Sequence, residues 1–200
     1  MKKNNYKMIR KLNEIKILNL LRHKAPISRS EMAKQTNISK VTISEIVKRL
    51  DKEGFTKTAG KGQSTSKGGK RPTLIKLNPD KGYVVGVEIK KNRVNIAIAN
   101  IESEIINECG FDYSDTETMN NVINKIFDCI DAELKALSIP YEKLISIGIG
   151  VPGFVDYEKG VLSYSHKGWE DKPFATRFSE KFGIPVLIEN DANMVAIGED

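Results

Sequence analysis

Charge is divided unequally along this chain, and the division constrains how the chain can fold. Residues 1–80 hold 20 Lys and Arg against 6 Asp and Glu, a net charge of +14. Residues 81–200 hold 12 against 20, a net charge of −8, so the two parts together give the formal +6 of the whole. This asymmetry indicates two modules, of which only the first attracts a polyanion. The alternative is a basic face that is merely solvated.

The composition is that of an ordinary folded protein, with 200 residues that are 40% hydrophobic and 29% charged. No run of about 18 apolar residues is present, and the N-terminus lacks the apolar core of a signal peptide. We therefore expect a cytoplasmic protein with no membrane partner. The two cysteines, Cys109 and Cys129, have no metal-type spacing. They are expected to be two buried free thiols without a functional role, and no metal site is predicted from the residues present.

Apolar residues at intervals of three to four predict an amphipathic helix near the N-terminus, ending near Ala25 before Pro26. The residues expected to face inward are Met8, Leu12, Ile15, Leu18 and Leu21.

Two shorter helices are predicted next. Ser28 followed by Glu31 is a capping box that starts the first, with Met32 and Ala33 inward, and Asn37 suits the tight turn that ends it. Ser39 is expected to cap the second helix. Its apolar residues are expected to face the other helices, namely Val41, Ile43, Ile46, Val47 and Leu50. A helix, a short turn and a second helix with small polar residues at its start is the geometry that places a helix N-terminus in a major groove.

After Gly54, residues 55–62 and 71–78 predict two strands around a loop rich in Gly and Lys, which is typical of a winged helix. Basic side chains on such a loop can reach phosphates or a minor groove. Residues 1–80 are therefore predicted to be a winged helix-turn-helix domain that binds double-stranded operator DNA, rather than a protein-contact module or a plain hairpin. The predicted DNA-binding residues are Ser28, Arg29, Ser39, Lys40, Thr42, Ser44, Glu45, Lys48, Lys67, Lys70 and Arg71.

Beyond Gly82 the pattern changes to strands. Three β-rich runs within residues 83–113 should pair as a meander. A helix follows, with one apolar face formed by Val122, Ile126, Ile130, Leu134 and Leu137, and residues 144–151 read as a buried strand. A helix over 173–182, a strand at 185–189 and a helix opening after Asp191 repeat the alternation, so residues 81–200 are predicted to be α/β.

Several short segments together carry a family resemblance. A winged helix combined with GGKRP, GYVVGVEI, GIGVPGFVD, GWED and IENDAN resembles the ROK family (repressors, open reading frames and sugar kinases), especially its regulators of the xylose-repressor type. The resemblance implies that residues 81–200 are the first lobe of an actin-like, ribonuclease-H-like fold with a sugar cleft between two lobes. It also implies a homodimer or higher homo-oligomer.

The resemblance also places a sugar site. The residues it implies are Pro152, Gly153, Gly168, Trp169, Glu189, Asn190 and Asp191. Asn190 and Asp191 offer the donors and acceptors that suit neighbouring sugar hydroxyls. Each glycine could instead serve an ordinary turn, Trp169 could be core, Asp191 could be only the cap of the next helix, and His166 is interpreted as an exposed histidine without a ligand.

In the family's kinases the residue matching Asp191 is the catalytic base, and an Asp-x-Gly-Gly-Thr turn lets backbone N–H groups approach ATP phosphates. Here that turn is Glu88-Ile89-Lys90-Lys91-Asn92, and its two lysine side chains should obstruct the approach. No enzyme activity is therefore expected. The predicted function is a sugar-responsive transcriptional regulator, most simply a repressor. The alternatives are a sugar kinase with an appended DNA-binding domain and a constitutive DNA-binding protein whose ROK part only oligomerises.

The chain ends at Asp200 inside an expected helix. The resemblance places a structural zinc motif and the second lobe beyond this point, so we expect a truncated polypeptide with no cofactor bound by the residues present.

Overall fold

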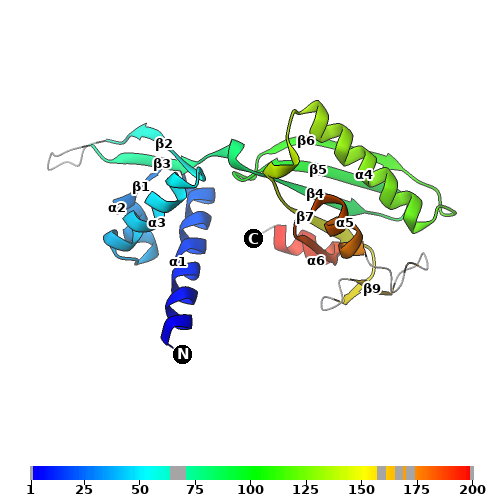
Figure 1. Cartoon of the computed structure of the whole chain (residues 1–200), viewed down its shortest axis with the longest axis horizontal. Coiled ribbons are helices and arrows are strands. Elements are labelled where there is room, and N and C mark those ends of the chain that lie inside the picture. Colours follow the sequence, from blue (N-terminus) through cyan, green and yellow to red (C-terminus); the bar gives the residue numbers. More distant parts are fainter. Residues whose placement is uncertain (1, 64–70, 157–160, 165–168, 170–173, 199–200) are drawn as a thin grey trace. The chain divides into compact units, whose positions relative to one another are not determined.

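The computed structural model of this chain describes residues 2–63, 71–156, 161–164, 169 and 174–198 (Figure 1). The chain divides into two compact units, Met1–Lys81 with Ile101–Ser103, and Gly82–Asn100 with Glu104–Asp200. The boundary predicted between residues 80 and 81 lies one residue from this division, but three residues of the later chain belong to the first unit. Within the described residues, no helix is long and apolar enough to cross a membrane.

The first unit is a three-helix module with a small sheet. Its helices are α1 (Lys2–Lys24), α2 (Arg29–Thr36) and α3 (Lys40–Lys52), and its strands are β1 (Ile27–Ser28), β2 (Thr56–Lys61) and β3 (Thr73–Leu77). A 3₁₀ turn, Pro79–Lys81, closes it. The strands lie in the order β1-β3-β2 with antiparallel pairing. The helix-turn-helix and the wing strands are as predicted, whereas β1 is too short to show a sequence pattern.

The buried face of α1 differs from the prediction. Leu21 is buried as expected, and it is joined by Ile17, which the three-to-four spacing had placed elsewhere. Met8, Leu12 and Ile15 are exposed by 64%, 52% and 44%. The prediction was wrong for this part of the helix because the core that receives α1 lies only against its C-terminal half.

The turns of the helix-turn-helix form as the sequence predicts. The Ser28 hydroxyl accepts a hydrogen bond from the Glu31 N–H and caps α2, and Asn37 ends α2 in the left-handed conformation with φ of 58°. The Ser39 hydroxyl likewise accepts from the Thr42 N–H and caps α3. Ile43, inward as predicted, is fully buried.

The second unit is built on a mixed five-stranded sheet in the order β10-β7-β4-β5-β6. The predicted meander is formed by β4 (Tyr83–Ile89), β5 (Arg93–Asn100) and β6 (Ile105–Asp112), which pair antiparallel. Strands β7 (Leu144–Val151) and β10 (Val186–Asn190) run parallel to β4 on its other side. A separate hairpin joins β8 (Phe154–Asp156) and β9 (Val161–Tyr164).

Helices cover this sheet unequally. The second unit's helices are α4 (Met119–Ala136), α5 (Phe174–Phe182), α6 (Asp191–Gly198) and a 3₁₀ turn, Tyr141–Lys143. The main core lies between α4, α5 and one face of the sheet, where Val87, Ile149 and Phe178 are buried. Helix α6 approaches the opposite face, where a Cβ at Gly150 would lie 3.0 Å from the Met194 sulfur. The α/β prediction is confirmed.

The turn between β5 and β6 contributes to the first unit. Ile101 packs against the first unit's core, and Lys76 forms an ion pair of 3.8 Å with Glu102. Sequence patterns did not reveal this contribution, because three residues in a turn have no periodicity that could assign them to a distant core.

Candidate functional site

The exposed face of α3 is the candidate nucleic-acid interface. Lys40, Ser44 and Lys48 recur every four residues and are exposed, so they lie along one side of the helix. Ile46 and Leu50, on the opposite side, are buried. The core therefore fixes the helix from behind and leaves a row of polar and basic side chains in front.

The start of α3 shows how its first turn is held. Ser39 accepts from the Thr42 N–H at 3.1 Å, and the two hydroxyls lie 2.9 Å apart. The Ser44 hydroxyl donates a hydrogen bond to the Lys40 carbonyl oxygen at 2.8 Å, so this donor is used within the helix. No acidic residue occupies the first turn. The positive end of the helix dipole is therefore unopposed there, which favours a bound anion.

Val41 is a residue of this interface that the sequence prediction placed in the core. It is 70% exposed, between Lys40 and Thr42 and next to Glu45 on the same helix face. The prediction was wrong because Ile43, which is fully buried, already occupies the inward direction of this turn. A position two residues before a buried helical residue points away from the core. That spacing could have revealed it, and an exposed branched methyl pair suits a thymine methyl group.

The other predicted DNA-binding residues lie in different settings. Ser28 is only 8% exposed and serves as the cap of α2, with its hydroxyl also 3.1 Å from that of Ser30. Arg29 and Arg71 are exposed. Lys67 and Lys70 lie outside the described residues.

In the second unit, the carboxyl ends of the parallel strands bring five of the seven predicted sugar residues to one edge of the sheet. Glu189 of β10 pairs with Gly150 of β7, and Gly150 pairs in turn with Glu88 of β4. Ligands of open α/β sheets characteristically bind outside this edge. The loop that follows β7, containing Pro152 and Gly153, and the start of α6 therefore lie at one end of the sheet.

Asn190 ties this edge together. Its Nδ2 donates to the Gly153 carbonyl at 2.8 Å, and its Oδ1 accepts from the backbone N–H groups of Ala192 and Asn193 at 3.0 and 3.3 Å. Asn190, and not Asp191, is thus the cap of α6, which begins at Asp191. Gly153 has φ of 148°, a conformation that favours glycine. The side chain that holds the loop is therefore the one that starts the helix.

The two carboxylates beside Asn190 have different surroundings. Glu189 Oε1 accepts from the Asn190 N–H at 2.8 Å and from the Asn193 side chain at 3.0 Å, so it supports the turn. Asp191 accepts from the Ala192 N–H through Oδ1 at 3.0 Å. Its Oδ2 has no protein hydrogen bond within the described part of the chain. Asp191 is half-buried and is the member of the set best placed to accept a ligand hydroxyl.

Trp169 lies in the core. It is 6% exposed, stacks on Tyr113 with ring centroids 6.0 Å apart, and contacts Phe174 at the same centroid distance. Its ring is therefore engaged by aromatic side chains of its own unit. Gly168 and His166 lie outside the described residues.

The turn between β4 and β5, which the family resemblance matches to the kinase phosphate turn, is held by hydrogen bonds to its own unit. The Lys90 N–H donates to the Arg93 carbonyl at 2.8 Å, and the Tyr113 hydroxyl donates to the Lys90 carbonyl at 2.6 Å. The Lys90 ammonium lies 3.2 Å from Glu88. Burial, followed by the negative charges of Asp115 and Glu117, raises the pKa of Tyr113 to about 12, so its hydroxyl stays a donor at neutral pH.

Two hollows of about 560 and 610 Å³ lie in this unit. The first lies over the sheet face that α6 approaches, above Gly86, Ala97 and Gly110, and the second adjoins Lys90 and Lys91. Neither is lined by Pro152, Gly153, Glu189, Asn190 or Asp191.

The fold joins a winged helix-turn-helix unit of the DNA-binding type to an α/β unit built on a mixed sheet. Residues 10–55 match the winged helix-turn-helix DNA-binding family, and residues 84–200 match the ROK family. The second match covers more than half of the chain, and the protein belongs to the ROK family.

Known relatives extend this likeness over nearly the whole chain. This chain is 31% identical to a xylose repressor of Caldicellulosiruptor bescii, in an alignment that covers 98% of this chain. It is also 31% identical to a xylose repressor of Bacillus subtilis, over 96% of this chain. The fold is confirmed by a crystal structure of a ROK family transcriptional regulator, described as a homologue of the Escherichia coli MLC protein. The superposition covers 92% of this chain and 46% of the regulator's chain, with a TM-score of 0.70 and 20% sequence identity. The chain spans about half the length of these curated relatives, 49% in both cases.

Proposed function

We propose that this protein is a sugar-responsive transcriptional repressor of carbohydrate-utilisation genes. The first unit would bind a palindromic operator as part of a homodimer in the cytoplasm. A sugar bound beside Asp191 would be the effector. Xylose is the first sugar to test, because the relatives named above are xylose repressors.

The observation that carries the proposal is the exposed face of α3 in a chain that also contains a ROK unit. The face presents Lys40, Val41, Ser44 and Lys48, and the core behind it holds it rigid. Phosphate contacts from the lysines would position the helix, and Val41 and Glu45 would contact base edges. The wing residue Arg71 is exposed and is proposed to reach the DNA backbone.

The DNA-binding step is tested by a gel-shift titration with the intergenic DNA upstream of the gene, at several salt concentrations. Lys40→Ala should weaken binding, and the slope of log K against log salt should fall by about 0.9, the contribution of one phosphate contact. Lys16→Ala is the matched control, because Lys16 is an exposed lysine on α1, away from the α3 face. Equal losses for the two variants would show that overall charge, and not this face, binds the DNA.

The sugar step is tested on the whole natural protein with and without xylose, glucose and N-acetylglucosamine. Asp191→Ala should leave operator binding in the absence of sugar unchanged and abolish any sugar response, because it removes the carboxylate best placed to accept a hydroxyl. Asp191→Asn, which keeps one acceptor oxygen, should retain part of the response. A wild-type protein whose DNA binding is unaffected by every sugar would exclude an inducer role.

Sugar binding changes DNA binding only if the two states of the protein bind the sugar unequally. A sugar that binds both states with equal affinity shifts no equilibrium, however tightly it binds. The titration is therefore read as the ratio of operator affinities with and without saturating sugar.

A sugar kinase with an appended DNA-binding domain is the second candidate, since Asp191 occupies the place of the kinase base. The turn at Lys90 and Lys91 argues against it, because the Lys90 N–H is already bonded to Arg93 and side chains stand where glycines would admit a phosphate. A coupled ADP-release assay decides between the two: turnover near about 1 per second, the low end for enzymes, would establish the kinase.

A constitutive DNA-binding protein is the third candidate. Thermal-shift screening against monosaccharides separates it from the repressor, because a ligand at about 100 times its Kd stabilises the native state by roughly 2.7 kcal/mol. A protein that binds its operator but is stabilised by no sugar would be of this kind.

A further inference from the structure

Helix α4 lies along the edge strand β6 in a regular series of side-chain contacts. Asn107 donates its amide N–H to Glu133, Cys109 lies against Cys129, and the ammonium of Lys125 lies 5.9 Å from the centre of the Phe111 ring. Steps of two along the strand match steps of four along the helix, as expected for elements that cross with their side chains facing. The two cysteines occupy the middle of the series.

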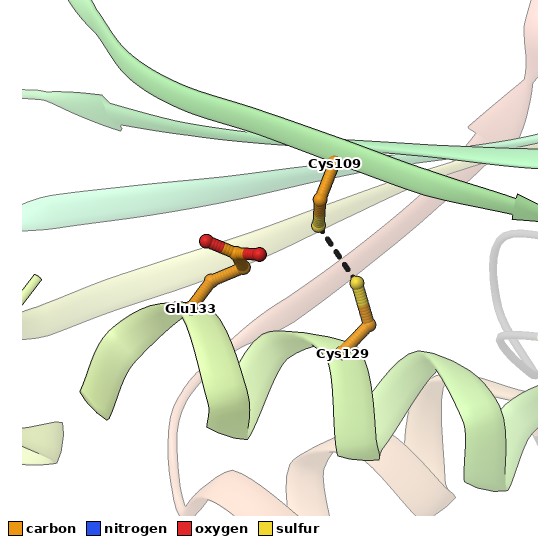
Figure 2. Close-up of side chains that lie close together, drawn as sticks. All are labelled: Cys109, Cys129 and Glu133. Carbon is orange, nitrogen blue, oxygen red and sulfur yellow. Dashed lines mark hydrogen bonds between the residues drawn. The ribbon is translucent and has the colours of Figure 1, made fainter. Parts of the chain in front are cut away.

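The two sulfur atoms are in direct contact. Cys109 Sγ and Cys129 Sγ lie 2.7 Å apart, and the Glu133 carboxylate lies beside them (Figure 2). The two sulfur atoms and one carboxylate oxygen of Glu133 all lie within 4.8 Å of one another. An S–S bond measures about 2.05 Å, so a further approach of about 0.65 Å would close one. Both cysteines are only half-buried, so an oxidant that is a small molecule can reach them.

We propose that Cys109 and Cys129 form a redox modification site, at which a small-molecule disulfide of the glutathione class closes an intramolecular disulfide that fastens α4 to β6. Within residues 1–200 the cysteines are Cys109 and Cys129, so in this part of the protein they can pair only with each other. This site is independent of the DNA-binding and sugar-binding residues.

The reaction balances as two successive exchanges. One protein thiolate attacks the small disulfide, forms a mixed disulfide and releases one small thiolate. The second protein sulfur, after giving its proton to solvent, attacks the bound sulfur and releases the other small thiolate. Two protein thiols thereby lose two electrons and two protons to form one S–S bond, and the small disulfide is reduced to two thiols.

The surroundings of Cys109 slow its exchange at neutral pH. Burial, the hydrogen bond with Cys129, and the negative charges of Cys129 and Glu133 raise the pKa of Cys109 to about 12. Cys109 therefore stays protonated at neutral pH, so its sulfur is a poor nucleophile there. The exchange that uses the Cys109 thiolate should accelerate as the pH rises towards that value.

The test incubates the folded chain with oxidised glutathione and counts free thiols by reaction with Ellman's reagent and by mass spectrometry. We expect the two thiols to disappear, with a product that lacks two hydrogens, carries no glutathione and is not disulfide-linked to a second chain. Closure should be at least about tenfold faster in the folded chain than in the chain unfolded in urea, because the fold holds the sulfurs together. Persistent double glutathione adducts, disulfide-linked dimers, or equal rates in folded and unfolded chains would overturn the proposal.

Three variants make the assignment specific. Cys109→Ser and Cys129→Ser should each stop at a stable single glutathione adduct on the cysteine that remains. Glu133→Gln should accelerate closure, because it removes a negative charge that raises the pKa of Cys109. Unchanged kinetics in all three variants would contradict the proposal. Protection of the thiols from Ellman's reagent by stoichiometric Zn²⁺, in the absence of oxidant, would also contradict it, because the cluster would then be a metal site.

The closed form should also be more resistant to heat. A bond that closes a loop of about 20 residues should raise the melting temperature of the chain by roughly 5–10 °C, and reduction should restore the original value. A fall in the melting temperature on oxidation would show that the native arrangement does not accommodate the bond.

Discussion

Helices α3 and α6 carry the two candidate sites, and both begin at a side-chain cap, but their caps are held differently. Among the described residues, the Ser39 side chain bonds only within the first turn of α3, to the N–H and the hydroxyl of Thr42. Asn190 caps α6 and also donates to Gly153, 37 residues earlier. The candidate nucleic-acid face is therefore a local property of one helix, whereas the candidate sugar-binding edge depends on bonds between distant segments.

The charge at the two helix starts differs in the same way. The first turn of α3 has no acidic residue and begins with Lys40, whereas the first turn of α6 begins with Asp191. A helix N-terminus with an added cation favours a phosphate, and one that already holds a carboxylate favours a neutral donor such as a hydroxyl. The two helix starts are therefore suited to two different kinds of ligand.

Asn190→Ala should have the largest effect among the variants that test this comparison. It removes the cap of α6 and the bond to Gly153, so we expect a loss of about 2–3 kcal/mol from the free energy of unfolding, measured by urea denaturation. Asn190→Asp keeps the capping oxygen but loses the donor to Gly153. Its free energy of unfolding should therefore lie between those of the wild type and Asn190→Ala. Equal stability of wild type and Asn190→Ala would show that the bond across the edge contributes nothing.

Tyr113→Phe should have an effect of about 2 kcal/mol that depends on pH. Since the pKa of Tyr113 is raised from 10.0 to about 12, the stability linked to its neutral hydroxyl is complete below pH 10 and is lost as the pH rises to about 12. The wild type should therefore be more stable than the variant at pH 8, and the gap should narrow between pH 10 and 12. Urea denaturation at several pH values measures it; a constant gap would exclude a raised pKa.

Ser39→Ala should cost about 1 kcal/mol of stability, the usual effect of losing a single local cap. Ser39→Asn, which retains a capping oxygen, is the matched control and should remain near the wild type. If Ser39→Ala proved as costly as Asn190→Ala, the distinction between a local and a tertiary cap would fail.

Val41→Ala should have the smallest effect on stability, within about 0.5 kcal/mol, because the side chain is 70% exposed. Operator affinity should nevertheless fall several-fold, by about 1 kcal/mol if the methyl groups contact a thymine. Gel-shift titration and urea denaturation of the same preparation separate the two. A loss of stability without a loss of operator affinity would show that Val41 has a structural role, as its apolar character suggested, and does not contact DNA.

Most of the helix-turn-helix could be predicted because its signals are local. Ser28 and Ser39 each accept from an N–H three positions away, and Asn37 ends α2 through its own left-handed backbone. The buried face of α3 follows from the spacing of its apolar residues, Ile43, Ile46, Val47 and Leu50. The same reasoning failed where burial depends on a partner. Met8, Leu12 and Ile15 have helical spacing, but no core meets them in the described structure.

The sequence by itself determined the two units, the charge contrast between them, the α/β alternation and the residues gathered in IENDAN, because composition and periodicity are properties of the chain. Only the tertiary structure decided that Asn190, and not Asp191, caps α6, that Trp169 stacks in the core on Tyr113, and that Cys109 meets Cys129. Each of these contacts joins residues whose partner depends on strand register or on where a helix crosses a sheet. Such partners are set by packing, which no local pattern records.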